Sequence, residues 1–304
     1  MELQLQHLCK HYGTKHAVND VSTTLTPGVY GLLGANGAGK TTLMRMICGV
    51  LKPTSGNVCL NGKSIDELGE DYYAHLGYMP QDFGFYPDFT AREFMCYMAA
   101  VKGLDKKEAT TRTKELLKLV NLHEVADKKI KSFSGGMKQR VVIAMALACN
   151  PKLLLADEPT TALDVVVQKG ILMMLMRLQK QLKNTMIIVS HDMGVHYQIT
   201  DRMAIMYSGS VAELGKTEDI FNDPIHPYTK MLVDALPRVG EDVQRVGIAG
   251  RPPALKNPPP GCRFAPRCPH ATDRCRSEVP KFREIRPGRF AACHLLEEEV
   301  KTNG

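Results

Sequence analysis

A glycine-rich turn that leads directly into lysine and threonine is the first feature of this chain with an evident chemical use. The segment 31–43 reads GLLGANGAGKTTL, and its glycines, Lys40 and Thr41 have the spacing of a phosphate-binding loop. Glycines let backbone N–H groups converge on phosphate oxygens, and Lys40 can reach the β- and γ-phosphates while the Thr41 hydroxyl holds Mg²⁺. We predict a nucleoside triphosphate site here. Its expected residues are Gly34, Ala35, Asn36, Gly37, Ala38, Gly39, Lys40, Thr41 and Thr42.

Two acidic residues follow a short apolar run further along the chain. The run 153–156 is predicted to be a buried strand, and Asp157 and Glu158 come directly after it. Buried parallel strands often carry functional groups at their carboxyl ends. Asp157 could therefore hold Mg²⁺, directly or through water, and Glu158 could act as the general base for an attacking water. The alternative without function is an acidic pair stabilised by a helix N-terminus.

Four cysteines follow a proline-rich segment, 251–261, which we expect to be a stiff extended linker. Four thiolates close together suit a metal centre. Zinc with His270 or His294 as substitute ligands, no metal, and disulfides remain open, although the C-x2-C spacing typical of zinc sites is absent. The segment from Pro237 onward has few large apolar side chains, so we expect it to need metal or cross-links to fold. The cysteines are Cys262, Cys268, Cys275 and Cys293.

Strands and helices that could position these groups are indicated by hydrophobic patterning. Apolar β-rich runs predict strands, and a 3.6-residue period predicts amphipathic helices. The predicted strands are 2–8, 17–25, 29–33, 57–60, 153–156 and 186–189, and the predicted helical stretches are 41–49, 91–123 and 171–182. Within the last helix we expect Met173, Met174 and Met176 to fill the core rather than to form a binding surface.

The composition is that of an ordinary globular protein: 304 residues, 44% hydrophobic, 23% charged and a net charge of +7. No apolar run approaches the ~20 residues of a membrane helix, and the N-terminus lacks the pattern of a signal peptide. We expect a cytosolic chain with reduced cysteines. Much of the positive charge falls after residue 250, which indicates a solvated surface or contact with an acidic partner or a cytoplasmic membrane face. We expect two domains, 1–236 and 237–304.

Together, the motifs resemble those of the ATP-binding subunits of ABC transporters over nearly the whole chain. The segment SFSGGMKQR, 132–140, is similar to the signature of that family, and LLLADEP, 153–159, is similar to its Walker B strand. Phe133 and Met137 replace the usual leucine and glutamine of the signature. The resemblance implies an α/β P-loop NTPase fold with a RecA-like core, an antiparallel β subdomain and a helical subdomain at about 85–150. A small Cys- and Pro-rich C-terminal domain would follow.

The resemblance also implies a role for each matching residue. Gln81 matches the glutamine that senses Mg²⁺ and the attacking water, His191 matches the switch histidine at the γ-phosphate, and Tyr12 matches the aromatic that stacks on adenine. In the family, the signature contacts the γ-phosphate held by the other subunit of a dimer. The signature residues are Ser134, Gly135 and Gly136, and the segment that crosses the dimer interface is Ala162, Leu163 and Asp164.

Different parts of the chain resemble different branches of the family. From residue 165 onward it is similar to oligopeptide, dipeptide and nickel importers, in which the four cysteines resemble ligands of a 4Fe–4S cluster. The stretch 12–104 looks more like subunits of drug and antibiotic exporters. We favour the importer, because the C-terminal module is peculiar to that branch. A soluble ABC ATPase with no transport role is a remote alternative.

Several partners follow from the resemblance. They are ATP and Mg²⁺, a second ABC ATPase subunit as homo- or heterodimer, integral membrane permease subunits and, for an importer, a substrate-binding protein. We expect no nucleic acid. The implied location is peripheral, at the cytoplasmic face of the cell membrane.

Overall fold

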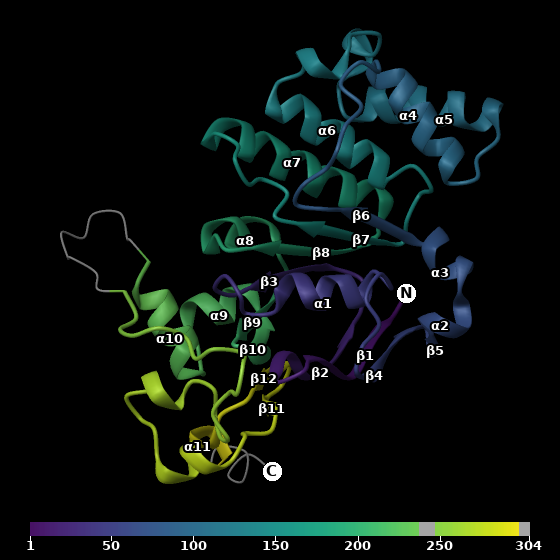
Figure 1. Cartoon of the computed structure of the whole chain (residues 1–304). Helices are drawn as coiled ribbons and strands as arrows, with labels where there is room; N and C mark the ends of the chain where they lie inside the picture. Colours follow the sequence, from purple (N-terminus) through teal and green to yellow (C-terminus); the bar gives the residue numbers. More distant parts are fainter. Residues whose placement is uncertain (237–246, 298–304) are drawn as a thin grey trace. The chain divides into compact units, whose positions relative to one another are not determined.

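The computed structural model describes residues 1–236 and 247–297 (Figure 1). The chain forms two compact units, each assembled from separate stretches of sequence. Unit 1 combines Thr26–Val29 with Ile65–Val189, whereas unit 2 combines Glu2–Leu25, Tyr30–Ser64 and the chain from Ser190 onward. Among the described residues, no helix has both the length and the apolar character that a membrane crossing requires.

Unit 1 contains a parallel group of strands with helices around it. The strands lie in the order β8 (Thr185–Ser190), β7 (Leu153–Asp157) and β6 (Leu76–Met79). Every residue of β7 and β8 is buried, as the continuous apolar runs of their sequences predict. Met79 pairs with Ala156, so the carboxyl ends of β6 and β7 lie at the same edge. The predicted strands 153–156 and 186–189 are confirmed.

The predicted helical stretch 91–123 consists of two main helices, α4 (Ala91–Val101) and α5 (Lys106–Leu119). Gly103, with φ of 87°, lies between them, and each helix begins at a capping box. The remaining elements of unit 1 are α2 (Ile65–Leu68), α3 (Glu70–Ala74), η1 (His123–Val125), η2 (Ile130–Ser132), α6 (Gly135–Ala146) and α7 (Val165–Leu182).

Helix α7 begins earlier than predicted and corrects one expectation about its methionines. Met174 is buried, but Met173 is 60% exposed and so does not fill the core. The buried residues Ile171, Leu172, Leu175 and Leu178 define the inner face of the helix. Met173 falls on the opposite side of the 3.6-residue period.

Unit 2 contains two sheets. The first is antiparallel, in the order β2-β1-β4-β5, and the second has the order β11-β12-β10-β9-β3 within this unit. The strands are β1 (Leu3–Tyr12), β2 (Lys15–Leu25), β3 (Val29–Leu33), β4 (Ser55–Leu60), β5 (Lys63–Ser64), β9 (Arg202–Tyr207), β10 (Ser210–Lys216), β11 (Arg283–Arg286) and β12 (Arg289–Ala291). The predicted strands in this part of the chain are confirmed, and β1 extends beyond its predicted end.

Unit 2 also contains several short helices. They are α1 (Lys40–Ile47), α8 (Met193–Ile199), α9 (Thr217–Asn222), α10 (Pro227–Asp234) and α11 (Asp273–Ser277), with short η3 (Ala265–Arg267) and η4 (His294–Leu296). The helix predicted at 41–49 corresponds to α1.

The described part of the C-terminal segment adds strands β11 and β12 to the second sheet of unit 2 and does not form a separate sheet. Strand β12 pairs antiparallel with β10, with Glu213 opposite Ala291. Phe264 also packs in the same apolar cluster as Tyr207 and Tyr228. The division of the chain into 1–236 and 237–304 stays a prediction, and Pro237 itself lies outside the described residues.

Candidate functional site

The glycine-rich loop lies between β3 and α1. Its shape requires glycine at two positions, because a Cβ atom there would clash with neighbouring backbone. Gly39 has φ of 101°, and a Cβ there would lie 2.3 Å from the carbonyl oxygen of Ala17. A Cβ on Gly34 would lie 2.6 Å from the carbonyl oxygen of Met206. The backbone therefore passes so close to neighbouring backbone that no side chain fits. Ala35, Asn36 and Gly37, at the tip, are exposed.

Lys40 is the first residue of α1, and its side chain folds back over this loop. Its Nζ donates to the carbonyl oxygens of Gly34 (2.5 Å) and Ala35 (3.3 Å), and the residue is only 7% exposed. The first turn of α1 carries no acidic residue. A helix N-terminus without acidic residues and a buried ammonium group are features that suit an anion. Thr41 is exposed beside Lys40.

Tyr12 and His191 are the other predicted site residues in unit 2. Tyr12 ends β1 with 50% of its surface exposed, and the Nζ atom of Lys10 lies 5.3 Å from its ring centroid. The ring is therefore available for stacking. His191 is exposed directly after β8, and the Asp192 side chain accepts from the Gly194 N–H (2.8 Å), which fixes the start of α8 behind it.

Unit 1 brings Gln81, Asp157 and Glu158 to one edge of its strands. Asp157 ends β7 and is 2% exposed, and exposed Gln81 lies just beyond the neighbouring strand β6. Glu158 has φ of 51°, and its Oε2 accepts a hydrogen bond from the Thr161 hydroxyl (3.0 Å). A non-glycine residue in this left-handed conformation is strained, which is common at functional sites. Sequence patterning did not reveal this strain.

The signature residues begin α6 and pack against the start of α7. The Ser134 hydroxyl caps α6 by accepting from the Met137 N–H (3.3 Å). A Cβ on Gly136 would lie 2.6 Å from Cγ1 of Val167, and one on Gly135 would lie 3.2 Å from Cδ2 of Leu163. An added side chain would displace Val167 or crowd Leu163, so the two glycines allow the signature to pack closely against the segment after β7.

That segment, 162–164, is itself held by α7. Ala162 has φ of 62°, and the Asp164 side chain accepts from the Val167 N–H (2.9 Å) as the helix cap. Val167 contacts the signature and donates to Asp164, yet sequence reasoning missed it. The only sequence signal was its place three residues after a capping aspartate.

The predicted ATP-site residues divide between the two units. Unit 2 holds Tyr12, the loop 34–42 and His191, whereas unit 1 holds Gln81, Ser134, Gly135, Gly136, Asp157, Glu158, Ala162, Leu163 and Asp164. Within unit 1, Gln81 and Asp157 follow neighbouring strands, and the signature glycines lie beside Leu163 and Val167. The roles of these residues and their assembly into one site stay predictions.

All nine cysteines of the chain are free thiols. The four in the C-terminal segment are electrostatic neighbours: burial, with smaller contributions from Cys262, Cys268 and Cys275, raises the pKa of Cys293 to about 11. The Cys262 N–H donates to the Cys275 carbonyl (2.8 Å), which brings the first and third together. Within 1–236 and 247–297, no three His, Cys, Asp or Glu side chains are arranged to hold a metal ion.

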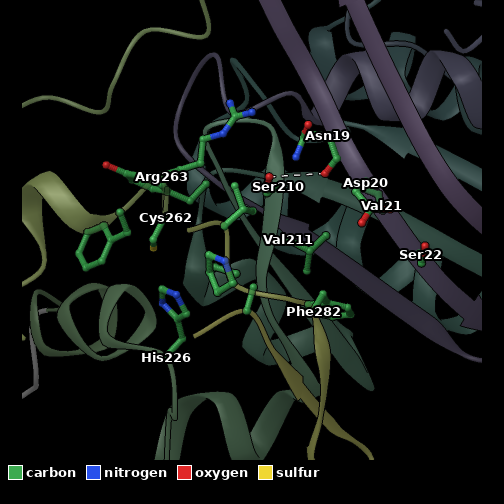
Figure 2. Close-up of a pocket in the computed structure, with 16 residues that line it drawn as sticks. Asn19, Asp20, Val21, Ser22, Ser210, Val211, His226, Cys262, Arg263 and Phe282 are labelled. Atoms are coloured by element: carbon green, nitrogen blue, oxygen red, sulfur yellow. Dashed lines mark hydrogen bonds between the residues drawn. The ribbon is translucent and has the colours of Figure 1, made fainter. Parts of the chain in front are cut away.

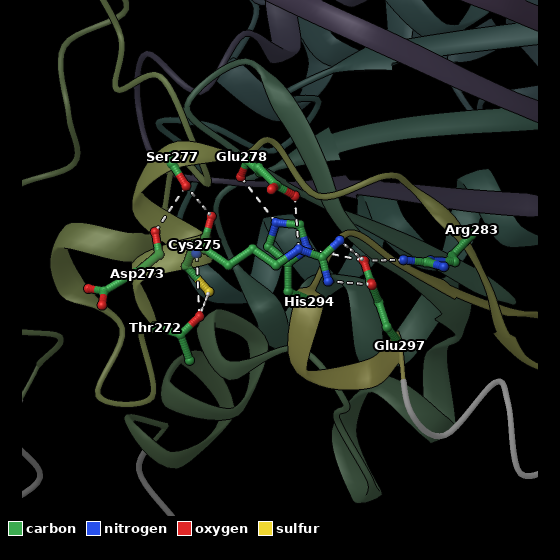
Figure 3. Close-up of polar contacts among 9 residues, drawn as sticks. Thr272, Asp273, Cys275, Ser277, Glu278, Arg283, His294 and Glu297 are labelled. Carbon is green, nitrogen blue, oxygen red and sulfur yellow. Dashed lines mark hydrogen bonds and ion pairs between the residues drawn. The ribbon is translucent and has the colours of Figure 1, made fainter.

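An ion-pair network lies beside Cys275 (Figure 3). Hydrogen bonds from Arg274 and His294, together with the nearby Arg283, lower the pKa of Glu297 to about 2. His294 Nδ1 bonds to Glu297 (3.0 Å), and its Nε2 donates to the Glu278 carbonyl (3.1 Å). Both ring nitrogens of this possible zinc ligand therefore have protein partners.

Comparison with known proteins identifies relatives along the chain. A family model described as ABC transporter matches residues 18–161, and one described as the C-terminal region of oligopeptide/dipeptide transporters matches residues 212–275. The oligopeptide transport ATP-binding protein OppD of Salmonella typhimurium is 38% identical, with 95% of this chain and 90% of that protein covered. AppD of Bacillus subtilis, also an oligopeptide transport ATP-binding protein, is 35% identical, covering 93% and 92%.

Solved structures with the same fold include ATP-binding cassettes. A subunit of an ABC transporter complex from Clostridium perfringens has a TM-score of 0.66 and 29% identity, covering 73% of this chain and 90% of that chain. A cassette solved as a dimer with ADP and phosphate has a TM-score of 0.63 and 30% identity, covering 71% and 98%. The α/β P-loop NTPase fold expected from the sequence is thereby confirmed.

Proposed function

This chain belongs to the ATP-binding subunits of ABC transporters, and we propose that it hydrolyses ATP to power the import of oligopeptides or dipeptides. The observation that carries the proposal is the combination of an ABC cassette with the C-terminal region of oligopeptide/dipeptide transporters in one chain. Relatives with oligopeptide transport in their names align over 95% of the chain, so they include the stretch 12–104. This extent favours the importer over the drug exporter and over an ATPase without a transporter.

In the proposed mechanism, unit 2 binds the nucleotide. The amides of 34–39 and the Lys40 ammonium hold the β- and γ-phosphates, and the exposed Tyr12 ring stacks on adenine. His191 contacts the γ-phosphate. Mg²⁺, held by Thr41, Asp157 and Gln81, would neutralise charge that develops on the phosphates.

Glu158 supplies the proton acceptor. Its carboxylate takes the proton of the attacking water while Gln81 helps to orient that water. The Thr161 hydroxyl, which donates to Glu158 Oε2, holds the carboxylate in one orientation. The left-handed backbone at Glu158 adds to this fixed placement.

The complete site is proposed to need a second ABC ATPase subunit. Ser134, Gly135 and Gly136 would contact the γ-phosphate bound by the partner, and 162–164 would cross the interface. Val165 and Val166, next to that segment, are 80% and 82% exposed, as expected for residues that a partner covers. A related cassette is dimeric.

A mixture of two inactive chains tests the dimer. Lys40→Ala removes phosphate binding and Ser134→Arg blocks the signature, so a mixed homodimer should regain one working site. Specific activity of the wild-type chain should also rise with protein concentration. No recovery, with activity independent of concentration, would contradict a homodimeric site.

Membrane partners are proposed for a surface that follows Gln81. Tyr86, Phe89 and Tyr97 form mutual ring contacts, yet 37% to 51% of each is exposed. Exposed aromatic clusters of this kind mark protein interfaces. We assign the cluster to permease subunits, so the chain would lie peripherally at the cytoplasmic face of the membrane. A substrate-binding protein would complete the importer, with no nucleic acid involved.

The four C-terminal cysteines are proposed to hold a 4Fe–4S cluster with a structural role, with zinc as the alternative. The support is the soft sulfur donor set and the nearness of Cys293 to Cys262, Cys268 and Cys275, although in the part of the chain that the structure describes no three such side chains are arranged as metal ligands. A bound cluster would link Cys262, Cys268, Cys275 and Cys293, which are separated in the sequence of the segment. Anaerobic purification with iron, sulfide and zinc assays tests this; stoichiometric zinc without iron would contradict the cluster.

Glu158→Gln is the direct test of the catalytic assignment. The variant keeps the shape of the side chain but removes the base, so ATP turnover should fall by about a thousandfold. ATP binding should remain, whereas Lys40→Ala should weaken binding itself. Calorimetry and phosphate release measure the two effects separately. Turnover within a few-fold of wild type in Glu158→Gln would make the assignment wrong.

A further inference from the structure

Part of the proline-rich segment, which we predicted to be a stiff extended linker, is hydrogen-bonded to a β-hairpin of unit 2. Residues 253–257 of this segment, which we name the strap, lie along the tip of the β1–β2 hairpin. The Leu255 carbonyl accepts from the His16 N–H (2.8 Å), and the Asn257 N–H donates to the Thr14 carbonyl (3.1 Å). Lys15 and Lys256 form an antiparallel bridge between these bonds. The strap thus adds a short strand to β2, the outer strand of its sheet.

This hairpin tip carries Tyr12. Tyr12 pairs with Lys15 across the turn, in which Gly13 has φ of 57°. The strap holds the residues Thr14–His16 on the far side of that turn. Because Tyr12 and Lys15 are paired directly, a fixed position for Lys15 also fixes the backbone that carries the Tyr12 ring.

A second attachment lies behind the phosphate loop. The Ser208 hydroxyl donates to the Pro253 carbonyl (3.2 Å), and Arg263 Nη1 donates to the Ser208 carbonyl (2.8 Å). The next residue, Gly209, donates its N–H to the carbonyl of Ala38 in the loop (2.9 Å). The C-terminal segment is therefore connected through one turn to the backbone that binds phosphate.

Arg263 is well placed to hold this arrangement. It is 92% buried, since only 8% of its surface is exposed, and it lies near His16: burial, His11 and then Arg263 lower the pKa of that histidine. Cys262 and Arg263 line the same cavity of about 90 Å³ as Asn19–Ser22 of β2 (Figure 2). The segment that carries the cysteines thus faces the same cavity as the strand whose tip the strap pairs with.

We propose that the strap and Arg263 position the adenine side of the ATP site, so that the C-terminal segment sets the affinity for ATP. The inference rests on the proposed function, because it takes Tyr12 as the residue that stacks on adenine. The strap does not touch the nucleotide; it acts through the hairpin. Cys262 directly precedes Arg263. A better ordered cysteine segment would therefore also fix Arg263 and, through it, the hairpin that carries Tyr12.

Asn257→Pro tests the strap at its exposed end. Proline lacks the N–H that bonds to Thr14 and cannot adopt the φ of 49° found at this position. Asn257→Gly is the matched control, because glycine keeps the N–H and tolerates that φ. Calorimetry in Mg²⁺ measures the Kd for ATP and for tripolyphosphate, which lacks the base.

We expect Asn257→Pro to weaken ATP binding by about tenfold, on the scale of a lost hydrogen bond, and tripolyphosphate binding by less than about twofold. Asn257→Gly should resemble wild type for both ligands. Equal losses for ATP and tripolyphosphate would overturn the proposal, because they would indicate damage to the phosphate loop. Unchanged ATP binding would overturn it as well.

Hydrogen exchange on the full chain gives a readout that does not depend on ATP. The His16 amide should be protected in wild type and exchange faster in Asn257→Pro. Arg263→Met should do the same with a weaker effect, and Arg263→Lys should restore part of the protection. Unprotected His16 in wild type would refute the strap. If Tyr12→Ala leaves ATP binding unchanged while the His16 amide responds, the role of Tyr12 in the proposed function fails instead.

Discussion

The phosphate loop and the C-terminal segment both belong to unit 2, but different forces hold them. The loop is shaped by backbone that approaches other backbone, as at Gly39 beside Ala17. The C-terminal segment is attached by side-chain charges, above all the pair Glu213–Arg289. We therefore expect the loop to be most sensitive to an atom added at Gly39, and the C-terminal segment to be most sensitive to loss of the buried charge of Arg289.

The charge pair joins β12 to β10 in the interior. Glu213 has no exposed surface, and it accepts from Arg289 Nη2 (3.0 Å) and from the N–H groups of Ile225 (3.1 Å) and His226 (2.9 Å). Arg289 Nη1 also bonds to Asp223 (2.9 Å). These hydrogen bonds offset part of the cost of removing the charges from water, although Nε of Arg289 has no hydrogen-bond partner among the described residues.

Arg289→Met should have the largest effect on stability. It leaves the Glu213 carboxylate buried without its cation, so we expect the free energy of unfolding of unit 2 to fall by about 3–5 kcal/mol. Arg286→Met is the control, because Arg286 bonds to the same Asp223 carboxylate but is 39% exposed. Its loss should be at most about 1 kcal/mol. Urea unfolding measures both; equal losses would show that burial does not distinguish the two pairs.

Gly39→Ala should have the next largest effect, on ATP binding. The new Cβ would meet the Ala17 carbonyl at 2.3 Å, so the loop must move and the Kd for ATP should rise about a hundredfold, or about 3 kcal/mol. Gly37→Ala is the matched control, since Gly37 also has positive φ but open space around its Cα. It should carry only a conformational cost of about 1 kcal/mol. Similar Kd values for the two variants would argue against a loop shaped by close approach.

A third, smaller effect should appear with pH. Burial lowers the pKa of His226 from 6.5 to about 4, so the unfolded chain takes up this proton before the folded chain does. The associated stability is complete above pH 6.5 and declines as the pH falls toward 4, by about 2 kcal/mol between pH 7 and 5.

His226→Asn provides the comparison for that pH effect. The His226 Nδ1 atom accepts from the Tyr228 N–H (3.0 Å) as the cap of α10, and asparagine can replace this acceptor without titrating. The difference in unfolding free energy between wild type and variant should therefore shrink or reverse in favour of the variant as the pH is lowered. A difference that is constant from pH 7 to 5 would mean that His226 does not titrate on unfolding.

Sequence reasoning was strongest where the contacts are local. The phosphate loop could be predicted because its glycines, lysine and helix start lie within a few residues, and each has a backbone reason to be there. The strands at β7 and β8 were predictable for the same reason, since continuous apolar runs indicate burial on both faces.

Contacts between distant residues were not predictable. Nothing in the composition of 251–261 indicates that Leu255 bonds to His16, and nothing local links Arg289 to Glu213. The packing of Gly136 on Val167 likewise depends on the tertiary arrangement of α6 and α7. The prediction for Met173 was wrong because it relied on methionine being apolar and not on its position, which falls on the exposed side of the helix.

Peptide uptake driven by this chain tests the central claim most directly. Proteoliposomes that contain the chain with its permease and binding-protein partners would be loaded with ATP on the side of the ATPase and supplied with a labelled oligopeptide on the other. The account predicts ATP-dependent accumulation of the peptide with the wild-type chain and none with Glu158→Gln. Equal accumulation with both chains, or movement of the peptide out instead of in, would contradict it.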